Sequence, residues 1–270
     1  MTQTPPPFGP LVDTHAHLDD DRLRSKLDEV LESARTAGIA QILAVATTAA
    51  DSVRVVALAH DHRGVFATVG FQPNNVAEAV EGDWERIVEL AKRPRVAALG
   101  ETGLDRYWDR APFDQQQDWF DRHLRLAHEL DLPVVIHCRE AEADIVAQLA
   151  ALNRPVRGVL HSFTGSIADA ERFMELGLHI SFAGMLTFNN RQLDALRDAA
   201  ASVPLDRLLV ETDSPYLSPH PLRGRPNQPA HVAWTALKLA ELHGLTPEEL
   251  AAATTANARK LFALPADDVL

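Results

Sequence analysis

Short apolar runs rich in β-branched residues alternate with longer amphipathic stretches along the whole chain. Short runs of this kind indicate buried strands, whereas apolar residues that recur every three to four positions indicate helices. The predicted strands lie near residues 11–15, 39–45, 65–70, 95–101, 133–137, 156–161, 178–182 and 206–211. The predicted helices lie near residues 22–36, 51–60, 84–91, 112–130, 140–152, 168–176, 191–201, 229–242 and 247–262.

The first and last predicted helices have the most specific local signals. The last, 247–262, begins at a capping box in which Thr246 caps, Pro247 occupies the first helical position and Glu249 completes the motif. The first, 22–36, has a single apolar stripe at spacings of three and four. That stripe consists of Leu23, Leu27, Val30, Leu31 and Ala34.

The alternation of strands and helices predicts parallel βαβ units, and eight of them predict a TIM-like (β/α)8 barrel. An open doubly wound sheet is the competing fold, but no G-x-G-x-x-G follows the first strand. No linker, short repeat or low-complexity segment interrupts the pattern. We therefore expect one domain over residues 1–270, with residues 1–10 as a flexible N-terminal lead-in.

Composition narrows the setting in which the protein works. The 270 residues are 46% hydrophobic, but no apolar run approaches the roughly 20 residues that span a bilayer. The N-terminal stretch lacks the features of a secretory signal. Cys138 is the single cysteine, which excludes an intrachain disulfide and suits a reducing compartment. We expect a cytoplasmic protein without membrane contact, and a monomer.

The formal net charge of −12 argues against broad neutralisation of nucleic-acid phosphates. It does not exclude a phosphate substrate, because two divalent cations would place about four positive charges where the composition shows none.

Six residues with metal-ligand chemistry stand at the ends of apolar runs in the first, fourth, fifth, sixth and eighth predicted strands. A histidine or carboxylate at any one of these positions is also compatible with an ordinary hydrogen-bonded core. In a (β/α)8 barrel, however, the carboxyl ends of all strands share one mouth, where the active site lies. The six residues are His15, His17, Glu101, His137, His161 and Asp213.

Histidine nitrogens and carboxylate oxygens together predict a centre for two divalent metal ions, with Mg, Mn and Zn as candidates. We expect His15, His17 and Asp213 to hold one ion and His137 and His161 to hold the other. Glu101 is the expected shared ligand because its strand lies between the two histidine groups. Two ions can activate water and stabilise an attacked phosphoryl or carbonyl group, and Asp213 is the candidate general base.

Two more carboxylates stand an even number of positions from a candidate ligand, so their side chains are expected on the same side of the chain. Asp13 lies on the same side of the first strand as His15 and His17, so it is placed to support them. Glu211 shares parity with Asp213, and we expect it to have a hydrogen-bonded structural role near the metals.

Eight stretches between about residues 11 and 263 together form a specific pattern: VDTHAHLD, VGFQPNN, GETGLDRYW, LPVVIHCREA, GVLHSFTGS, SFAGMLTF, LLVETDSPYLSPHPLRGRPNQPA and TTANARKLF. Through these stretches the chain resembles the TatD family of metal-dependent deoxyribonucleases, within the amidohydrolase-like superfamily. The resemblance implies a TIM-like barrel with a divalent-metal site that hydrolyses phosphodiesters, often as a 3′–5′ exonuclease. The implied partner is DNA, as single strands or 3′ ends. It also supports Asp213 as ligand and base, with Glu101, His137 and His161 as ligands.

Three positions depart from the family pattern. Gln72 stands where relatives often have the His of a G-x-H-P motif, and Gln cannot serve as a titratable acid. Asn227-Gln228-Pro229 replaces an Asn-Glu-Pro motif, and Arg106 stands where relatives often have an aromatic residue. Arg106 is either a phosphate contact or a solvated loop arginine.

The candidate substrate contacts are Gln72, Arg106, Arg139, Arg225 and Asn227. Arg139 can pair with a phosphate through two hydrogen bonds, or form a salt bridge to a neighbouring glutamate. Arg225 and Asn227 lie in the proline-rich loop after the eighth strand, where barrel enzymes often bind phosphate. Four aromatic residues near loops could stack on bases: Phe71, Tyr107, Trp108 and Phe188.

Two other function classes remain open. One is an amide, lactone or aminoacyl-ester hydrolase of the same superfamily, although Glu101 occupies the region where many such enzymes use a carboxylated lysine. The other is a non-catalytic barrel that binds metal or nucleic acid.

Overall fold

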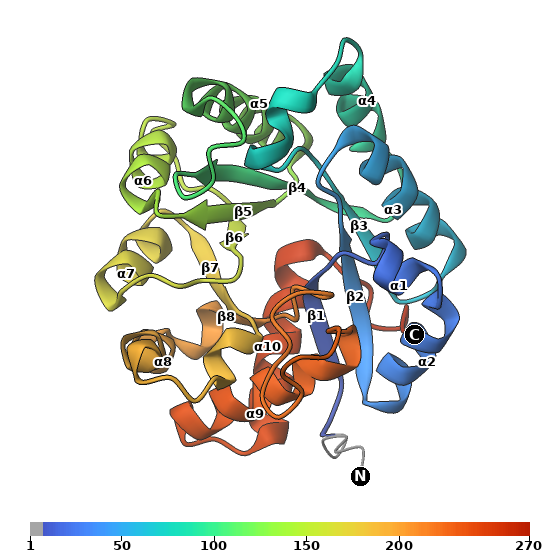
Figure 1. Cartoon of the computed structure of the whole chain (residues 1–270), viewed down its shortest axis with the longest axis vertical. Coiled ribbons are helices and arrows are strands. Elements are labelled where there is room, and N and C mark those ends of the chain that lie inside the picture. Colours follow the sequence, from blue (N-terminus) through green and yellow to red (C-terminus); the bar gives the residue numbers. More distant parts are fainter. Residues whose placement is uncertain (1–7) are drawn as a thin grey trace.

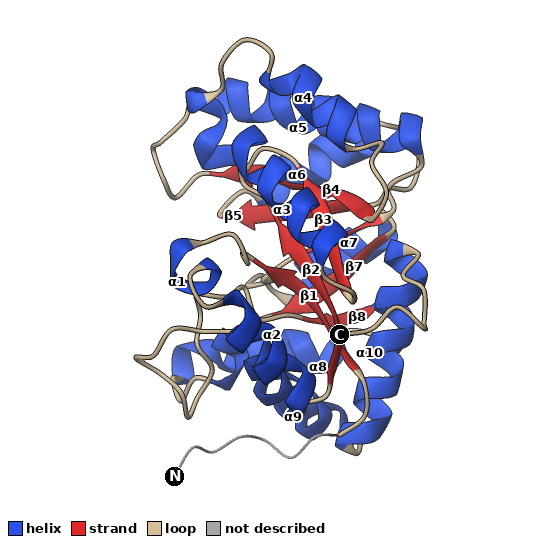
Figure 2. Cartoon of the chain, turned by 90° about the vertical axis from the view of Figure 1, so that its right-hand side faces the viewer, coloured by secondary structure: helices blue, strands red, loops and turns tan. Residues whose placement is uncertain are grey.

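A computed structural model describes residues 8–270, and most of the predicted lead-in, residues 1–7, lies outside the described part. Eight strands form one parallel sheet in the order of the sequence, enclosed by helices (Figures 1 and 2). This arrangement confirms the TIM-like barrel. The strands are β1 Leu11–Ala16, β2 Ile39–Val45, β3 Val65–Val69, β4 Val96–Asp105, β5 Val134–Arg139, β6 Gly158–Leu160, β7 Leu178–Phe182 and β8 Leu208–Val210.

The barrel is nearly closed between β1 and the chain that follows β8. At this seam the Thr14 hydroxyl donates to the carbonyl of Val210 at 2.9 Å. The backbone N–H of Asp213 donates to the His15 carbonyl at 2.9 Å, and that of His17 donates to the Ser214 carbonyl at 2.8 Å. The same backbone that closes the barrel therefore positions three candidate ligands.

The described helices follow the predicted pattern with one exception. The stretch predicted as a single helix, 22–36, is broken because Lys26 adopts φ −139° and ψ 34°, outside the helical region. The predicted capping box at Thr246 is confirmed. The helices are α1 Asp21–Arg24, α2 Leu27–Thr36, α3 Ala49–Asp61, α4 Asp83–Leu90, α5 Phe113–Leu130, α6 Glu142–Ala150, α7 Ile167–Glu175, α8 Asp194–Ser202, α9 Val232–His243 and α10 Pro247–Phe262.

An apolar cluster occupies the end of the barrel at which the strands begin. Half of its members are the second residue of a strand, such as Val12, Val135 and Leu209, and they gather with Leu261 and Phe262 from the end of α10. Polar residues are left to the opposite end, where a site can form. None of the described helices is long and apolar enough to span a membrane.

Strand β4 is longer than predicted. It also requires a glycine at one position, where its backbone comes very close to that of β5. It continues to Asp105, so Glu101 lies within the strand. Gly103 pairs with His137 in the ladder and has φ 138°. A Cβ atom at this position would lie 2.0 Å from the His137 carbonyl oxygen.

We predict that Gly103→Ala lowers the free energy of unfolding by about 3 kcal/mol or more, because it combines a disfavoured backbone conformation with a backbone clash. Gly244→Ala is the matched control. Gly244 also has a positive φ, 64°, but a Cβ atom added there would have nothing within 4 Å, so its expected cost is about 1 kcal/mol. Urea denaturation measures both, and equal losses would contradict the role given to Gly103.

His123 in α5 holds the backbone that follows β3. Its Nε2 accepts from the backbone N–H of Phe71 at 3.1 Å, and its Nδ1–H donates to the Trp119 carbonyl at 2.6 Å. This pair of bonds requires the neutral ring. Burial lowers the pKa of His123 to about 4.

A pH-dependent loss of stability follows from His123. Because its pKa is about 4 in the folded state against an ordinary 6.5, the unfolded chain binds more protons between these values and stability falls as pH falls. Between pH 6.5 and 5 the residue should cost about 2 kcal/mol. Denaturation of the wild type and His123→Gln checks this: the stability advantage of the wild type should shrink by that amount. A constant difference would contradict it.

Candidate metal centre

The structure brings all six candidate ligands to the mouth at the carboxyl ends of the strands. Glu101 lies at the centre. Its Oε1 is 2.8 Å from His137 Nδ1 and 3.1 Å from His161 Nε2. Its Oε2 faces the other way, 3.5 Å from His15 Nε2 and 3.8 Å from His17 Nε2. One carboxylate thus addresses both histidine groups through separate oxygens.

Asp213 completes the side of the centre that contains His15 and His17. Its Oδ1 is 3.4 Å from His17 Nε2 and 3.8 Å from His15 Nε2. The residue adopts φ 56°, a left-handed conformation that Asp and Asn tolerate better than most residues. This conformation turns the chain after β8 so that the carboxylate reaches the mouth.

The ligand atoms form two overlapping groups, each within 4.8 Å: His15, His17 and Asp213, and His15, Glu101 and His161. His15 belongs to both groups, and its ring stacks on that of His161 with 4.0 Å between centroids. The geometry therefore divides the histidines less cleanly between two sites than the sequence analysis expects.

Hydrogen bonds orient the histidine rings as metal ligands require. His17 Nδ1 donates to the Val45 carbonyl at 3.0 Å, and His137 Nε2 donates to Asp105 Oδ2 at 2.9 Å. His161 Nδ1 lies 3.4 Å from Glu211 Oε1. In each ring the other nitrogen faces Glu101, so its lone pair is directed into the centre. The buried nitrogen and oxygen donors fit divalent metal ions.

The electrostatics of the centre show why it attracts cations. Burial alone would raise the pKa of Glu101, but the surrounding histidines hold that pKa well below its ordinary value. Against the effect of burial, Asp213 raises the pKa of His17 to about 9, and Glu101 raises the pKa of His161 well above its usual range. In the absence of metal, protons on His17, His137 and His161 therefore balance the buried carboxylates, whereas burial lowers the pKa of His15.

Asp105 is a functional residue that the sequence analysis missed. Its side chain supports His137 and also accepts from Asn74 Nδ2 at 2.9 Å. Burial opposes its ionisation, but the bond from His137 and those from Trp108 and Asn74 lower the pKa of Asp105 to about 2. The sequence contained one signal for this role: Asp105 stands four positions after Glu101, so both side chains lie on the same side of β4. The predicted strand ended at residue 101, so this relation was not recognised.

The supporting carboxylates Asp13 and Glu211 are both fully buried. Asp13 accepts from the Thr212 backbone N–H at 2.8 Å and the Thr212 hydroxyl at 2.6 Å, and burial raises the pKa of Asp13 to about 8. Glu211 Oε1 accepts from the Ser162 backbone N–H at 2.7 Å. Asp13 thus ties β1 to the chain after β8, and Glu211 lies behind His161.

Two of the candidate substrate contacts are occupied by other interactions. Arg106 forms a two-pronged ion pair with Asp144, at 2.7 and 2.8 Å, and lies over the Phe113 ring. Asn227 is fully buried, and its amide donates to the carbonyls of Thr212 at 2.9 Å and Tyr216 at 2.6 Å. Asn227 therefore stabilises the loop after β8, and its amide is not available to a substrate.

The other three candidates are differently placed. Gln72 Oε1 accepts from the Asn74 backbone N–H at 2.7 Å and caps the short helix Pro73–Glu78. Arg139 is exposed, with its guanidinium 4.2 Å from the centre of the Tyr107 ring. Arg225 is exposed, and its carbonyl accepts from the Ser218 hydroxyl.

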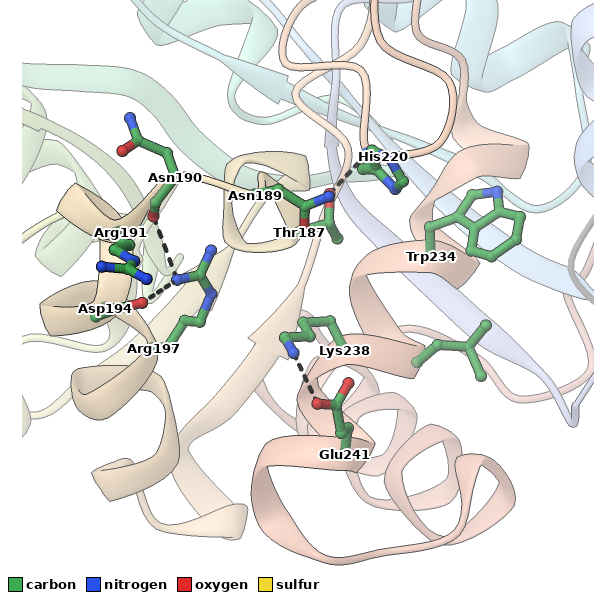
Figure 3. Close-up of a pocket in the computed structure, with 11 residues that line it drawn as sticks. Thr187, Asn189, Asn190, Arg191, Asp194, Arg197, His220, Trp234, Lys238 and Glu241 are labelled. Carbon is green, nitrogen blue, oxygen red and sulfur yellow. Dashed lines mark hydrogen bonds and ion pairs between the residues drawn. The ribbon is translucent and has the colours of Figure 1, made fainter.

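Two hollows lie near the loops at this end of the barrel. One, of about 460 Å³, lies between the chain after β7 and α9 and contains none of the six ligands. Figure 3 shows that two of its basic groups, Arg197 and Lys238, are already paired with Asp194 and Glu241. The other, of about 420 Å³, adjoins the metal centre because His17 lines it.

A (β/α)8 barrel with buried histidines and a shared carboxylate at its mouth defines a metal-dependent hydrolase. Residues 12–263 match the sequence model of the TatD related DNase family. The chain belongs to the TatD family.

Bacterial relatives extend over nearly the same length. The chain is 43% identical to the uncharacterized metal-dependent hydrolase YcfH of Escherichia coli, covering 95% of this chain and 97% of that one. It is 38% identical to the uncharacterized metal-dependent hydrolase YabD of Bacillus subtilis, covering 93% and 98%. The crystal structure of YjjV, a TatD homologue from E. coli, superposes with a TM-score of 0.88 at 34% identity, covering 94% and 98%.

We predict that metal binding releases protons from this centre. At pH 7.5 His17, with a pKa raised to about 9, carries a proton that must leave before the ring can bind a cation. Apparent affinity for Zn²⁺ or Mn²⁺ should therefore fall about tenfold per pH unit for each displaced proton as pH drops below 9. Calorimetric titrations in buffers with different ionisation enthalpies count the protons. Equal affinity at pH 6 and pH 8 would contradict the assignment.

Proposed function

We propose that this TatD-family hydrolase is a deoxyribonuclease that hydrolyses phosphodiester bonds at DNA ends, as a 3′–5′ exonuclease, with two divalent ions held by the six ligands. The observation that carries the proposal is the double contact of Glu101, whose two oxygens address the His137–His161 and the His15–His17 groups separately. A carboxylate in this position suits a paired centre.

The residues divide the work of the reaction. Divalent ions at such a centre supply Lewis acidity and make water a nucleophile at neutral pH. Asp213 is ionised at neutral pH, because its histidine neighbours lower its pKa despite burial, and 15% of its side chain is exposed. It can therefore meet a water molecule from the mouth and take its proton. Glu101 is more enclosed, with 5% of its side chain exposed, and acts as the fixed ligand.

Support for DNA as the substrate comes from the family description and from the surroundings of the mouth. No carboxylate lies within ion-pair distance of Arg139 in the described part of the chain, so its guanidinium is available to a phosphate. The overall charge of −12 offers no broad basic surface. Recognition of DNA would therefore be confined to the mouth of the barrel, which suits an enzyme that acts at the ends of DNA strands. We place the protein in the cytoplasm, where Cys138, its thiol pKa raised by burial to about 12, would stay reduced.

We predict that the purified protein shortens single-stranded DNA labelled at the 5′ end when Mg²⁺, Mn²⁺ or Zn²⁺ is supplied. Asp213→Asn should lower the rate about 100-fold or more, because the amide cannot accept the proton. Asn also tolerates the left-handed backbone of this position, so the fold should persist. Gel electrophoresis of the labelled strand measures the rate.

Asp206→Asn is the matched control. Asp206 is exposed and lies in the turn that leads into β8, at the end of the barrel opposite the mouth, so its loss should leave the rate unchanged. Absence of shortening with all three metals would overturn the DNase proposal. Parallel amide, lactone and aminoacyl-ester substrates then distinguish another hydrolase from a non-catalytic barrel, which would retain DNA without turnover.

A further inference from the structure

Exposed aromatic rings covered by arginines lie on two sides of the metal centre. On one side Tyr216 is 48% exposed, and the Arg22 guanidinium lies 4.5 Å from its ring centre. On the other side Tyr107 and Trp108 are 49% and 45% exposed, with Arg139 4.2 Å from the Tyr107 ring centre. Arg110 covers Trp108 at 5.0 Å. We call these the Tyr216 platform and the Tyr107 platform.

Each platform is tied to a different part of the metal centre. The Tyr216 ring packs edge-on against His17, with 6.0 Å between centroids. The backbone N–H groups of Tyr107 and Trp108 each donate to Asp105 Oδ1 at 2.9 Å, while Asp105 Oδ2 accepts from His137. Each platform is therefore directly connected to residues of the candidate metal centre.

The two platforms differ in charge. The hollow of about 420 Å³ beside Tyr216 is lined by four carboxylates, from Asp19, Asp20, Asp21 and Asp51. The arginines near it are already paired: Arg22 with Asp20, Arg24 with Asp21, and Arg54 with Asp19 and Asp51. This side offers carboxylate acceptors for hydroxyl and amino groups, and its paired arginines are not available to a phosphate.

The Tyr107 platform offers unpaired cations instead. Within residues 8–270 neither Arg110 nor Arg139 has a carboxylate within 4.0 Å, and both guanidinium groups rest on aromatic faces. Arginines on aromatic rings, beside exposed faces on which bases can stack, are typical of surfaces that follow single-stranded nucleic acid.

From this asymmetry we propose that a single DNA strand crosses the mouth in one direction. Its terminal nucleoside occupies the hollow against Tyr216, and the phosphate-bearing remainder lies over Tyr107 and Trp108 with its phosphates near Arg110 and Arg139. The hollow is near the lower limit of small-molecule pockets, which suits one nucleoside. The arginines beside the hollow are already paired with its carboxylates, so the hollow offers no free guanidinium to a further phosphate and the strand ends there. This inference rests on the proposed function and gives a physical reason for action at chain ends.

Binding measurements separate the two platforms. In Asp213→Asn, which is not expected to cleave, binding of a fluorescein-labelled 12-residue thymidylate is followed by anisotropy, and binding of unlabelled thymidine by calorimetry. Tyr107→Ala and Arg139→Ala should weaken oligonucleotide binding about tenfold and leave thymidine binding unchanged. Arg139→Ala should also reduce the salt dependence of oligonucleotide binding. Tyr216→Ala should weaken both ligands, and Tyr216→Phe should restore both.

Matched controls lie outside the platforms. Val53 is an exposed apolar residue of α3, and Arg63 is an exposed arginine just before β3, at the opposite end of the barrel. Val53→Ala and Arg63→Ala should leave both affinities unchanged. The proposal is overturned if thymidine binding survives Tyr216→Ala, if Tyr107→Ala behaves as Val53→Ala does, or if neither ligand binds the parent protein.

The binding assay tests the strand path, and the cleavage assay tests the DNase proposal, so each proposal can be contradicted on its own. If the wild type shortens DNA but platform variants bind as their parent does, the strand path is wrong and the DNase proposal stands. If binding follows the platforms and no metal supports cleavage, the DNase proposal is wrong and the strand path stands.

Discussion

The burial of Glu101 is the constraint on which the rest of the structure depends. A carboxylate with 5% of its side chain exposed is costly unless cations or hydrogen-bond donors compensate its charge. His17, His137 and His161 supply that compensation as protonated rings, because the neighbouring carboxylates raise their pKa values against the effect of burial, whereas burial lowers the pKa of His15. Divalent ions can supply the compensation in place of these protons. Asp105 and Glu211 in turn hold the rings of His137 and His161. The polar end of the barrel is thus an ordered set of charges around one carboxylate.

Stability and function share the seam of the barrel. Direct pairing of β1 with β8 is sparse, and the seam depends on Asp13, Thr212 and the backbone beside His15, His17 and Asp213. The apolar cluster at the other end, closed by α10, carries no such polar groups. Burying the charged site at one end of the barrel costs free energy of folding. Hydrophobic burial at the other end offsets that cost.

The net charge of the whole chain and the local charge set by the placement of its arginines are different quantities. A net charge of −12 sets the long-range field, whereas contacts at the mouth are governed by the groups within a Debye length of about 8–10 Å. Near Tyr216 the arginines are neutralised by neighbouring carboxylates, and near Tyr107 they are not. Overall composition averages over this difference, so a local preference for phosphate can coexist with an acidic protein.

The sequence by itself determined the barrel and the gathering of the six candidate ligands at its mouth, because apolar periodicity reports which residues are buried and strand ends in a (β/α)8 fold converge whatever the details. The capping box at Thr246 is equally local and was predictable for the same reason. The break at Lys26, the extension of β4 to Asp105 and the burial of Asn227 were decided only by the tertiary structure. Each depends on contacts between segments distant in the chain or on backbone angles that periodicity does not encode. Proximity of His15 to both ligand groups, and the pairing of some arginines but not others, likewise arise only when separate βα loops meet in space.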